Sequence, residues 1–356
     1  MEYKQKLEQL LETVARENAS DLHISSGMPP TLRIDGRLVP LMKYAPLSPK
    51  DTEGLSLALL NEKQKEYLFE EKEIDLSYTY RDKARFRVNV YFESGDMSSA
   101  LRLIPAKIRT IEELEMPSIL HRFTALAQGF FLAVGPSGHG KSTTLAALID
   151  EINHTRSEHI ITIEDPIEYI FTQDRCIIDQ REVGRDTKSF KRALRAAFRQ
   201  DPDVIMIGEM RDAETMATAI TAAETGHLVY ATLHTNNAAQ TIDRIIDSFP
   251  PEQQHQVRSQ LALTLIGVVS KRLVPKIDGG IVPACEVMIT NAAVRNLIRE
   301  NKVHELNLVI ETGADQGMIS LNRALSDLVK QGVISLETAE MYSLNPKELK
   351  MLASST

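Results

Sequence analysis

The sequence predicts an α/β protein, in which a domain built on a parallel sheet follows a smaller α+β domain. Two observations support this prediction. From about residue 115 onward, short apolar runs alternate with helical patterns, as expected for parallel strands joined by crossover helices. Before residue 105, several short segments alternate apolar and polar residues, which is typical of half-buried antiparallel strands. We therefore expect domains at residues 1–105 and 115–356, joined by a linker at 106–114.

The first domain begins with a helical pattern. Apolar residues recur at helical spacing over residues 4–18, which predicts an amphipathic helix. In residues 31–41, Asp35-Gly36 lies between two arms of alternating polarity, a pattern typical of a hairpin with a two-residue turn. The domain is therefore expected to open with a helix and a hairpin.

Three further strands complete this domain. Alternation over residues 76–80 and 84–92 predicts two antiparallel strands with a turn at Asp82-Lys83. A third strand is expected at residues 100–104, and Pro105 marks the start of the linker. Together these elements predict a small antiparallel sheet.

A glycine-rich loop follows the first apolar run of the second domain. Residues 135–142 match the pattern GxxxxGK[ST] and lie between a strand-like run, residues 130–134, and a helical pattern. Such a loop turns its N–H groups toward phosphate, Lys141 can reach the β- and γ-phosphates, and the Ser142 hydroxyl can bind Mg²⁺. We expect ATP and Mg²⁺ as cofactors, with nucleotide contacts from Ser137, Gly138, His139, Gly140, Lys141, Ser142 and Thr143.

Three more apolar runs end in polar residues. Residues 160–163 precede Glu164, and residues 204–207 lead through a glycine to Glu209. The third run ends in His234. Because the carboxyl ends of parallel strands lie at one edge of a sheet, these side chains are expected beside the glycine-rich loop.

The two acids have a catalytic interpretation. Glu209 is placed to orient Mg²⁺ and to accept a proton from the attacking water. Glu164, with Asp165 and Glu168, gives a second acidic cluster for the metal or the water. A single acid at a strand end is more often a helix cap, but two beside a phosphate loop favour catalysis. His234 and His227 have two open interpretations, hydrogen bonding to the γ-phosphate or a purely structural role.

Cationic side chains gather in two places. Arg85, Arg87 and Arg102 project from the polar side of the predicted sheet, which is either a solvated face or a functional surface. A helical pattern before Glu209 carries a second group, namely Lys188, Lys191, Arg192, Arg195 and Arg199. This basic stripe is either solvated, in contact with an acidic neighbouring subunit, or in contact with a polyanion.

The composition of the chain limits which classes of protein it can belong to. Of 356 residues, 43% are apolar, enough for about two domain cores. We expect a cytoplasmic protein because the sequence shows neither a signal pattern nor an apolar run near the roughly 18 residues of a membrane span. Cys176 and Cys285 form no CxxC pair, which disfavours a disulfide framework or a cysteine zinc site. The net charge of −8 argues against a nucleic-acid carrier.

Several motifs resemble one family. Four segments are similar to motifs of the secretion and type IV pilus motor ATPases. The Walker A, Asp-box, Walker B and His-box motifs are matched, in that order, by GPSGHGKSTTLA, ITIEDPIEY, RQDPDVIMIGEMRD and AAETGHLVYATLHT. ASDLHISSGMPP, RFRVNVYF and LRLIP extend the resemblance into the first domain. AVRNLIRE, residues 293–300, is similar to the C-terminal motif of the pilus-retraction members. The absence of a long N-terminal extension and of a tetracysteine zinc site argues against the pilus-extension members.

The resemblance implies a homohexamer of chains with a PAS-like first domain and a RecA-like ATPase domain, which ends in a helical region from about residue 291. It implies that Ser142, Glu164 and Glu209 surround the metal, and that Glu209, Glu164 and His234 serve catalysis. Arg87 and Arg102 match arginines that approach the nucleotide. His139 departs from the family pattern, which has a small residue there, and Ile281 replaces an expected basic residue.

The resemblance therefore implies a hexameric ATPase that powers type IV pilus retraction and twitching motility. Expected partners are an inner-membrane platform protein and a paralogous retraction ATPase, so the protein is expected at the cytoplasmic face of the pilus machine. Alternatives are an accessory retraction ATPase, a type II secretion or pilus-assembly ATPase, a nucleic-acid translocase, and a nucleotide-gated binding module. We expect residues 293–300 to be required for retraction but not for hydrolysis.

Overall fold

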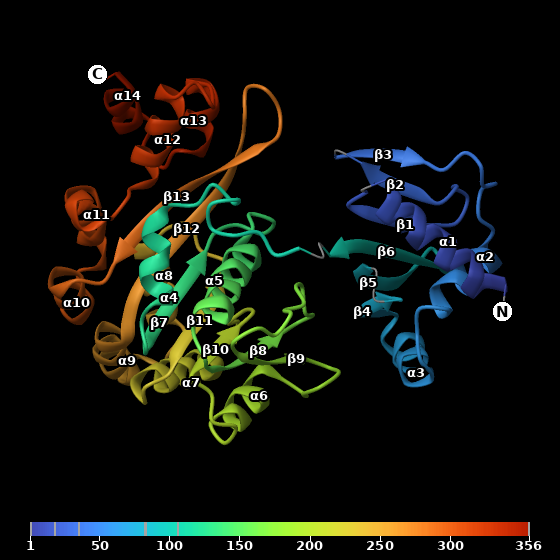
Figure 1. Ribbon diagram of the computed structural model, residues 1–356, viewed down its shortest axis with the longest axis horizontal. Helices are drawn as coiled ribbons and strands as arrows, with labels where there is room; N and C mark the ends of the chain where they lie inside the picture. Colours follow the sequence, from blue (N-terminus) through green and yellow to red (C-terminus); the bar gives the residue numbers. More distant parts are fainter. Residues whose placement is uncertain (1, 18, 35, 82–83, 105–106, 355–356) are drawn as a thin grey trace. The chain divides into compact units, whose positions relative to one another are not determined.

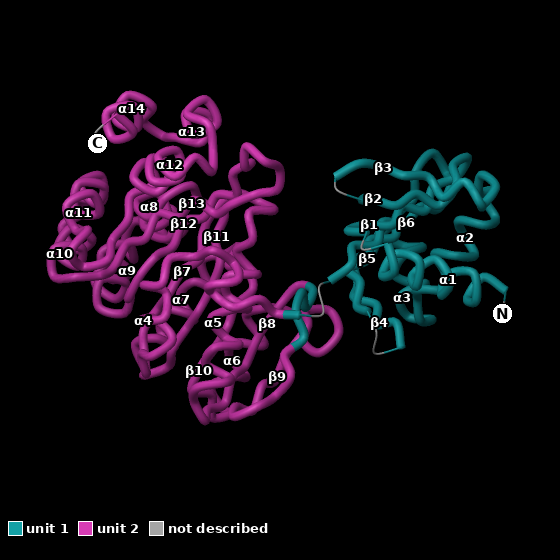
Figure 2. Tube along the Cα trace, turned by 45° about the horizontal axis from the view of Figure 1, so that its top comes forward, with its two compact units in different colours: residues 1–107, 166–170 teal, residues 108–165, 171–356 magenta. Residues whose placement is uncertain are grey.

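The chain divides into two compact units. The computed structural model describes all residues except 1, 18, 35, 82–83, 105–106 and 355–356 (Figure 1). Unit 1 comprises residues 1–107 and 166–170, and unit 2 comprises residues 108–165 and 171–356 (Figure 2). No helix in the described part of the chain is both long and apolar enough to cross a membrane.

Unit 1 contains one antiparallel sheet with the strand order β3-β2-β1-β6-β5-β4. Its strands are β1 (Asp21–Ile24), β2 (Thr31–Ile34), β3 (Arg37–Pro40), β4 (Glu73–Tyr80), β5 (Ala84–Glu93) and β6 (Asp96–Ile104). Its helices are α1 (Glu2–Arg16), α2 (Pro49–Leu57) and α3 (Glu62–Glu71). The predicted helix, the hairpin pairing and the three later strands are confirmed, whereas β1, α2 and α3 were not predicted. The turn residues Asp35 and Asp82-Lys83, and the linker residue Pro105, lie outside the described residues.

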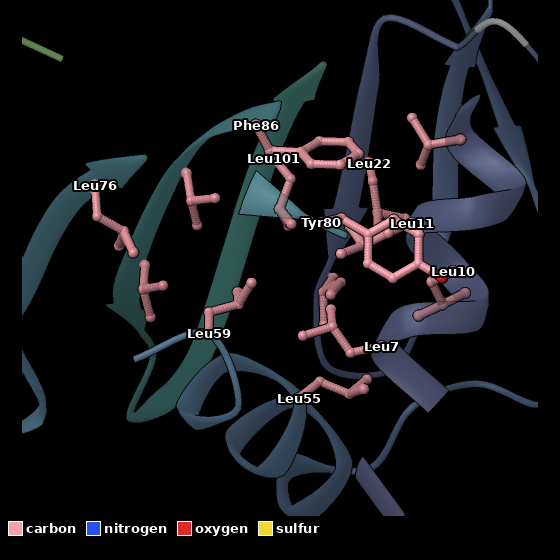
Figure 3. Close-up of a cluster of buried hydrophobic side chains, with 14 of the residues drawn as sticks. Leu7, Leu10, Leu11, Leu22, Leu55, Leu59, Leu76, Tyr80, Phe86 and Leu101 are labelled. Atoms are coloured by element: carbon pink, nitrogen blue, oxygen red, sulfur yellow. The ribbon is translucent and has the colours of Figure 1, made fainter. Parts of the chain in front are cut away.

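The core of unit 1 explains the alternating pattern of β5. Phe86, Val88 and Val90 are fully buried, while the residues between them are half-buried. The apolar stripe of α1, which includes Leu7 and Leu10, packs into the same core (Figure 3). Burying each such side chain stabilises the fold by roughly 1.5–3 kcal/mol.

Unit 2 contains a seven-stranded sheet with the order β13-β12-β7-β11-β10-β8-β9. Its strands are β7 (Gly129–Val134), β8 (His159–Glu164), β9 (Ile177–Glu182), β10 (Val204–Ile207), β11 (Leu228–Leu233), β12 (Leu265–Pro275) and β13 (Ile281–Ile289). All neighbouring strands are parallel except β12 and β13, which form an antiparallel hairpin. Every residue of β7, β10 and β11 is buried, which explains their continuous apolar sequences. The sequence did not predict β9 or the hairpin.

Helices flank this sheet and follow the hairpin. They are α4 (His121–Thr124), α5 (Lys141–Thr155), α6 (Phe190–Ala197), α7 (Ala213–Glu224), α8 (Ala238–Asp247), α9 (Pro251–Thr264), α10 (Ala292–Arg299), α11 (Leu306–Thr312), α12 (Leu321–Lys330), α13 (Leu336–Tyr342) and α14 (Pro346–Ser354). The last three helices lie against the outer part of the hairpin (Figure 1). There Val274 and Val282 share a core cluster with Leu325 of α12, so the hairpin is fixed on that side.

The core of unit 1 gives a test of this packing. Phe86→Ala is expected to lower the free energy of unfolding of unit 1 by about 3–5 kcal/mol, because it leaves a cavity among fully buried side chains. Equilibrium urea unfolding followed by circular dichroism measures the change. Asn89→Ala, on the opposite face of the same strand, is the control and should change the value by less than about 0.5 kcal/mol. Equal effects of the two substitutions would contradict the assignment of faces.

Candidate nucleotide-binding site

The loop between β7 and α5 has a positive φ at each of its three glycines, of which Gly135 and Gly140 border the phosphate-binding turn. Gly135 has a φ of 144°, and an added Cβ would lie 2.4 Å from the Lys271 carbonyl oxygen. Gly140 has a φ of 75° and occupies the N-cap position of α5, where it supplies no side-chain oxygen to the first turn. A helix N-terminus of this kind offers backbone N–H groups to a phosphate. The loop therefore has the geometry that the sequence motif predicts.

The polar side chains of the loop differ in how far they are buried. Ser137 is exposed at the tip of the loop, while Ser142 and Thr143 are half-buried in the first turn of α5. The Lys141 ammonium is buried and donates to the carbonyl oxygens of Gly135 and Pro136, each at 3.0 Å. Phosphate oxygens are charged and therefore stronger acceptors than these carbonyls, so the ammonium can exchange one set for the other.

The carboxyl ends of β8, β10 and β11 bring polar side chains to this loop. Strand β10 lies between β8 and β11 in the sheet, and β11 also pairs with β7. Glu164 is buried at the end of β8, where Thr162 Oγ1 donates to its Oε1 at 2.7 Å. Gly208 leaves room for it, since an added Cβ would lie 3.3 Å from the Glu164 Cα atom.

Glu209, His234 and Lys141 form a continuous polar row. His234 Nε2 lies 3.3 Å from Glu209 Oε1, and His234 Nδ1 lies 3.3 Å from Lys141 Nζ. Burial, and then the charge of Lys141, lower the pKa of His234, which favours the neutral ring. Because an ammonium can only donate, Nδ1 accepts from Lys141 and Nε2 carries the hydrogen that faces Glu209. Three residues from distant parts of the sequence thus meet in one site.

Arg211 is a member of the site that the sequence interpretation missed. Its Nε and Nη2 each lie 2.9 Å from Glu209 Oε2, and its Nη1 lies 3.8 Å from Asp165 Oδ2. The signal was its position two residues after Glu209. Glu209 is therefore held on one oxygen by Arg211 and faces His234 with the other.

His227 does not join this site. It precedes β11, whereas His234 follows the same six-residue strand. Its Nδ1 contacts the carbonyl oxygen of Ala222 at 2.9 Å, and its ring packs against Phe198. Because the two histidines lie at opposite ends of the strand, the contacts of His227 favour the structural one of its two open interpretations.

The predicted arginines of the first domain have partners inside unit 1. Arg87 Nη1 lies 3.7 Å from Glu168 Oε1, and Arg102 Nε donates to Asp21 Oδ1 at 2.8 Å. Arg85 donates to the Ser77 hydroxyl at 2.9 Å. The side chain of Arg102 is nevertheless 70% exposed. A role for Arg87 and Arg102 at the nucleotide stays a prediction.

The predicted basic stripe divides into two parts. Lys191 and Arg195 of α6 pair with Glu214 of α7. The other three cations of the stripe line a pocket of about 310 Å³ together with Arg181 of β9, and they are Lys188, Arg192 and Arg199. The stripe is therefore partly a salt-bridged helix face.

The β12–β13 hairpin positions the loop that carries His234. The backbone carbonyl oxygen of Asn236 accepts a hydrogen bond from Ser270 Oγ at 2.9 Å. Its side-chain oxygen accepts one from Arg272. Glu286 Oε1 accepts from the Ala238 N–H at 2.7 Å, at the start of α8. Burial raises the pKa of Glu286 to about 7.

Known proteins share this architecture. The family described as type II/IV secretion system protein matches residues 3–349. The type IV pilus retraction ATPase PilT of Pseudomonas aeruginosa is 47% identical over 339 residues, covering 95% of this chain and 98% of the relative. PilU, a type IV pilus ATPase of the same organism, is 42% identical, covering 98% of this chain and 91% of the relative.

Solved structures of related ATPases also resemble this chain along nearly its whole length. The pilus retraction motor PilT with bound ADP matches with a TM-score of 0.90 and 48% identity, covering 97% of this chain and 98% of that one. The ATPase DotB of Legionella pneumophila matches with a TM-score of 0.79 and 29% identity, covering 93% of each chain. The predicted fold class, a RecA-like ATPase domain preceded by a small α+β domain, is confirmed.

The raised pKa of Glu286 predicts a pH dependence of stability. The native carboxyl holds its proton up to about pH 7, whereas the unfolded one loses it near 4.5. The contribution of the protonated Glu286 carboxyl to the free energy of unfolding is therefore complete below pH 4.5 and is lost as pH rises to about 7. Relative to Glu286→Gln, which stays neutral, the wild type should lose roughly 1–3 kcal/mol over this interval. Urea unfolding at several pH values measures both proteins, and parallel profiles would contradict the assignment.

Proposed function

The chain belongs to the family of type II/IV secretion system proteins, and on that premise we propose that it is the ATP-hydrolysing motor of type IV pilus retraction. The meeting of Lys141, His234 and Glu209 beside the phosphate loop supports hydrolysis. Similarity to PilT along nearly the whole chain supports retraction as the work that hydrolysis powers.

Mg²⁺ is the metal that the donors of this site fit. Ser142 offers a hydroxyl, and Glu164 and Glu209 offer carboxylates, which are the oxygen ligands that Mg²⁺ prefers. Mg²⁺ usually takes few ligands from a protein and completes its shell with water and phosphate oxygens. When bound, it would neutralise charge on the β- and γ-phosphates.

The residues of the site divide the remaining work. Lys141 leaves the carbonyls of its own loop and binds phosphate oxygens. Glu209 accepts the proton of the attacking water, and its orientation is fixed because Arg211 and His234 hold its two oxygens separately. Glu164, which accepts a hydrogen bond from Thr162, would orient water in the shell of a bound metal.

Arg87 and Arg102 are proposed to supply positive charge to the nucleotide, as the family resemblance implies. Arg87 Nη1 lies 3.7 Å from Glu168 Oε1, a weak contact that a phosphate can replace. An arginine that reaches the transferring phosphate contributes a factor of about 10³–10⁵ in rate. Movement of these residues would then control hydrolysis.

The assembly proposed for this motor is a homohexamer at the cytoplasmic face of the inner membrane. There it would act on a membrane platform protein of the pilus machine. A paralogous retraction ATPase is a further proposed partner.

Similarity to PilU supports a second candidate, an accessory retraction ATPase. A strain that lacks its own retraction ATPases separates the two candidates. Expression of this chain alone restores twitching if it is the primary motor, and restores it only together with a primary motor if it is the accessory one.

If Glu209 is the catalytic base, replacing it should stop ATP hydrolysis without preventing ATP binding. Glu209→Gln should bind ATP with near wild-type affinity but lower the hydrolysis rate at least about 100-fold, because an amide cannot accept the proton. Phosphate release and binding of a fluorescent ATP analogue measure the two properties. Glu214→Gln, which removes a surface carboxylate on α7, is the control and should keep its rate. A Glu209→Gln variant that retains a tenth of the rate would exclude Glu209 as the base.

The motif at residues 293–300 predicts a separation of hydrolysis from motility. Val294 and Ile298 of α10 are buried, whereas Arg295 and Arg299 are exposed. The double substitution Arg295→Glu, Arg299→Glu should keep ATP hydrolysis within about twofold, because it leaves the buried face intact, and should abolish twitching. Lys302→Glu is the matched control for charge reversal outside the motif. Normal twitching of the double variant would contradict the proposed role.

A further inference from the structure

β12 extends beyond the end of its neighbour β7. The two strands pair up to Val134 and Ser270, where β7 ends and the phosphate loop begins. β12 continues to Pro275 and keeps its pairing with β13 on the other side. Among the strands in the described part of the chain, none pairs with residues 271–273 on the side that faces β7 (Figure 1).

The phosphate loop occupies this edge of β12. Gly135 lies directly against the carbonyl oxygen of Lys271. Lys271 Nζ lies 3.4 Å from Thr144 Oγ1 in the first turn of α5. The Leu273 N–H donates to His139 Nδ1 at 2.8 Å. The imidazole thus accepts the hydrogen bond that another strand would have accepted.

We propose that His139 is a positioning residue of the phosphate loop, which it fixes to β12 by accepting the Leu273 N–H. This inference rests on the proposed ATPase function of the same loop. The segment of β12 that contains Leu273 is held in place by packing, because the next residue, Val274, belongs to the core cluster with α12 to α14. A fixed loop presents its N–H groups to phosphate without first being ordered, which strengthens nucleotide binding.

The surroundings of His139 keep its acceptor available. The charged groups that face it are Arg272 and Lys271 of β12 and Lys141 at the start of α5. Burial first, and then these three cations, lower its pKa, so the ring is neutral at pH 7. Protonation would turn Nδ1 into a donor and break the bond to Leu273. The contribution of this bond is therefore complete above pH 6.5 and is lost as pH falls toward the lowered pKa of the native ring.

Two substitutions separate the acceptor from the size of the side chain. In His139→Asn, the amide oxygen is bonded to Cγ as Nδ1 is, so it can accept the same N–H but does not titrate. His139→Leu keeps apolar bulk without an acceptor, and so leaves the Leu273 N–H without its partner. The test measures the Kd for ADP in the presence of Mg²⁺ by calorimetry on the full chain, with thermal unfolding as a check of folding.

We expect His139→Leu to weaken ADP binding about five- to tenfold at pH 7.5 and to raise KM for ATP more than it lowers kcat. His139→Asn should bind within about twofold of the wild type. As pH falls below 6.5 and reaches the lowered pKa of the native ring, the wild type should lose affinity relative to His139→Asn, because only the imidazole takes up a proton.

Two results would overturn the inference. One is wild-type affinity in His139→Leu, and the other is equal weakening in His139→Asn and His139→Leu when both remain folded. In either case ADP binding by the wild type would leave the proposed function intact. Failure of the wild type to bind ADP would instead contradict the proposed function.

Discussion

The site depends on one constraint of parallel sheets, which is that all carboxyl ends of neighbouring strands lie at the same edge. β7, β11, β10 and β8 are consecutive neighbours, so the phosphate loop, His234, Glu209 and Glu164 come from the ends of adjacent strands. The strands themselves are almost completely buried. Their positions are therefore fixed by packing, and the loops that follow them inherit that precision.

A row of hydrogen-bonding side chains organises the polar groups at this edge. Arg211, Glu209, His234 and Lys141 follow one another at 2.9–3.3 Å, so each group has a partner of suitable hydrogen-bonding character. A neutral His234 between an acid and an ammonium can transmit a change at one of them to the other, because both its nitrogens are engaged. Binding of phosphate at Lys141 is thus physically connected to the carboxylate proposed as the base.

The sequence predicted the parts of this structure that depend on local patterns. The glycine-rich loop, the acids at the strand ends and the alternating face of β5 follow from spacing alone. The β12–β13 hairpin was missed because its buried lysine and glutamate, Lys271 and Glu286, interrupt the apolar pattern expected of core strands. The partner of His139 could not be predicted, because it depends on the relative lengths of β7 and β12. The local sequence left the role of His227 open, because a histidine at either end of a strand gives the same local pattern.

The central claim is that the chain hydrolyses ATP as an assembled ring. Steady-state ATP hydrolysis and assembly size, measured together across a range of protein concentrations, test it most directly. We expect the rate per subunit to rise as hexamers form, because the proposed motor is a homohexamer. An isolated subunit that hydrolyses ATP as fast as the assembly would contradict the account.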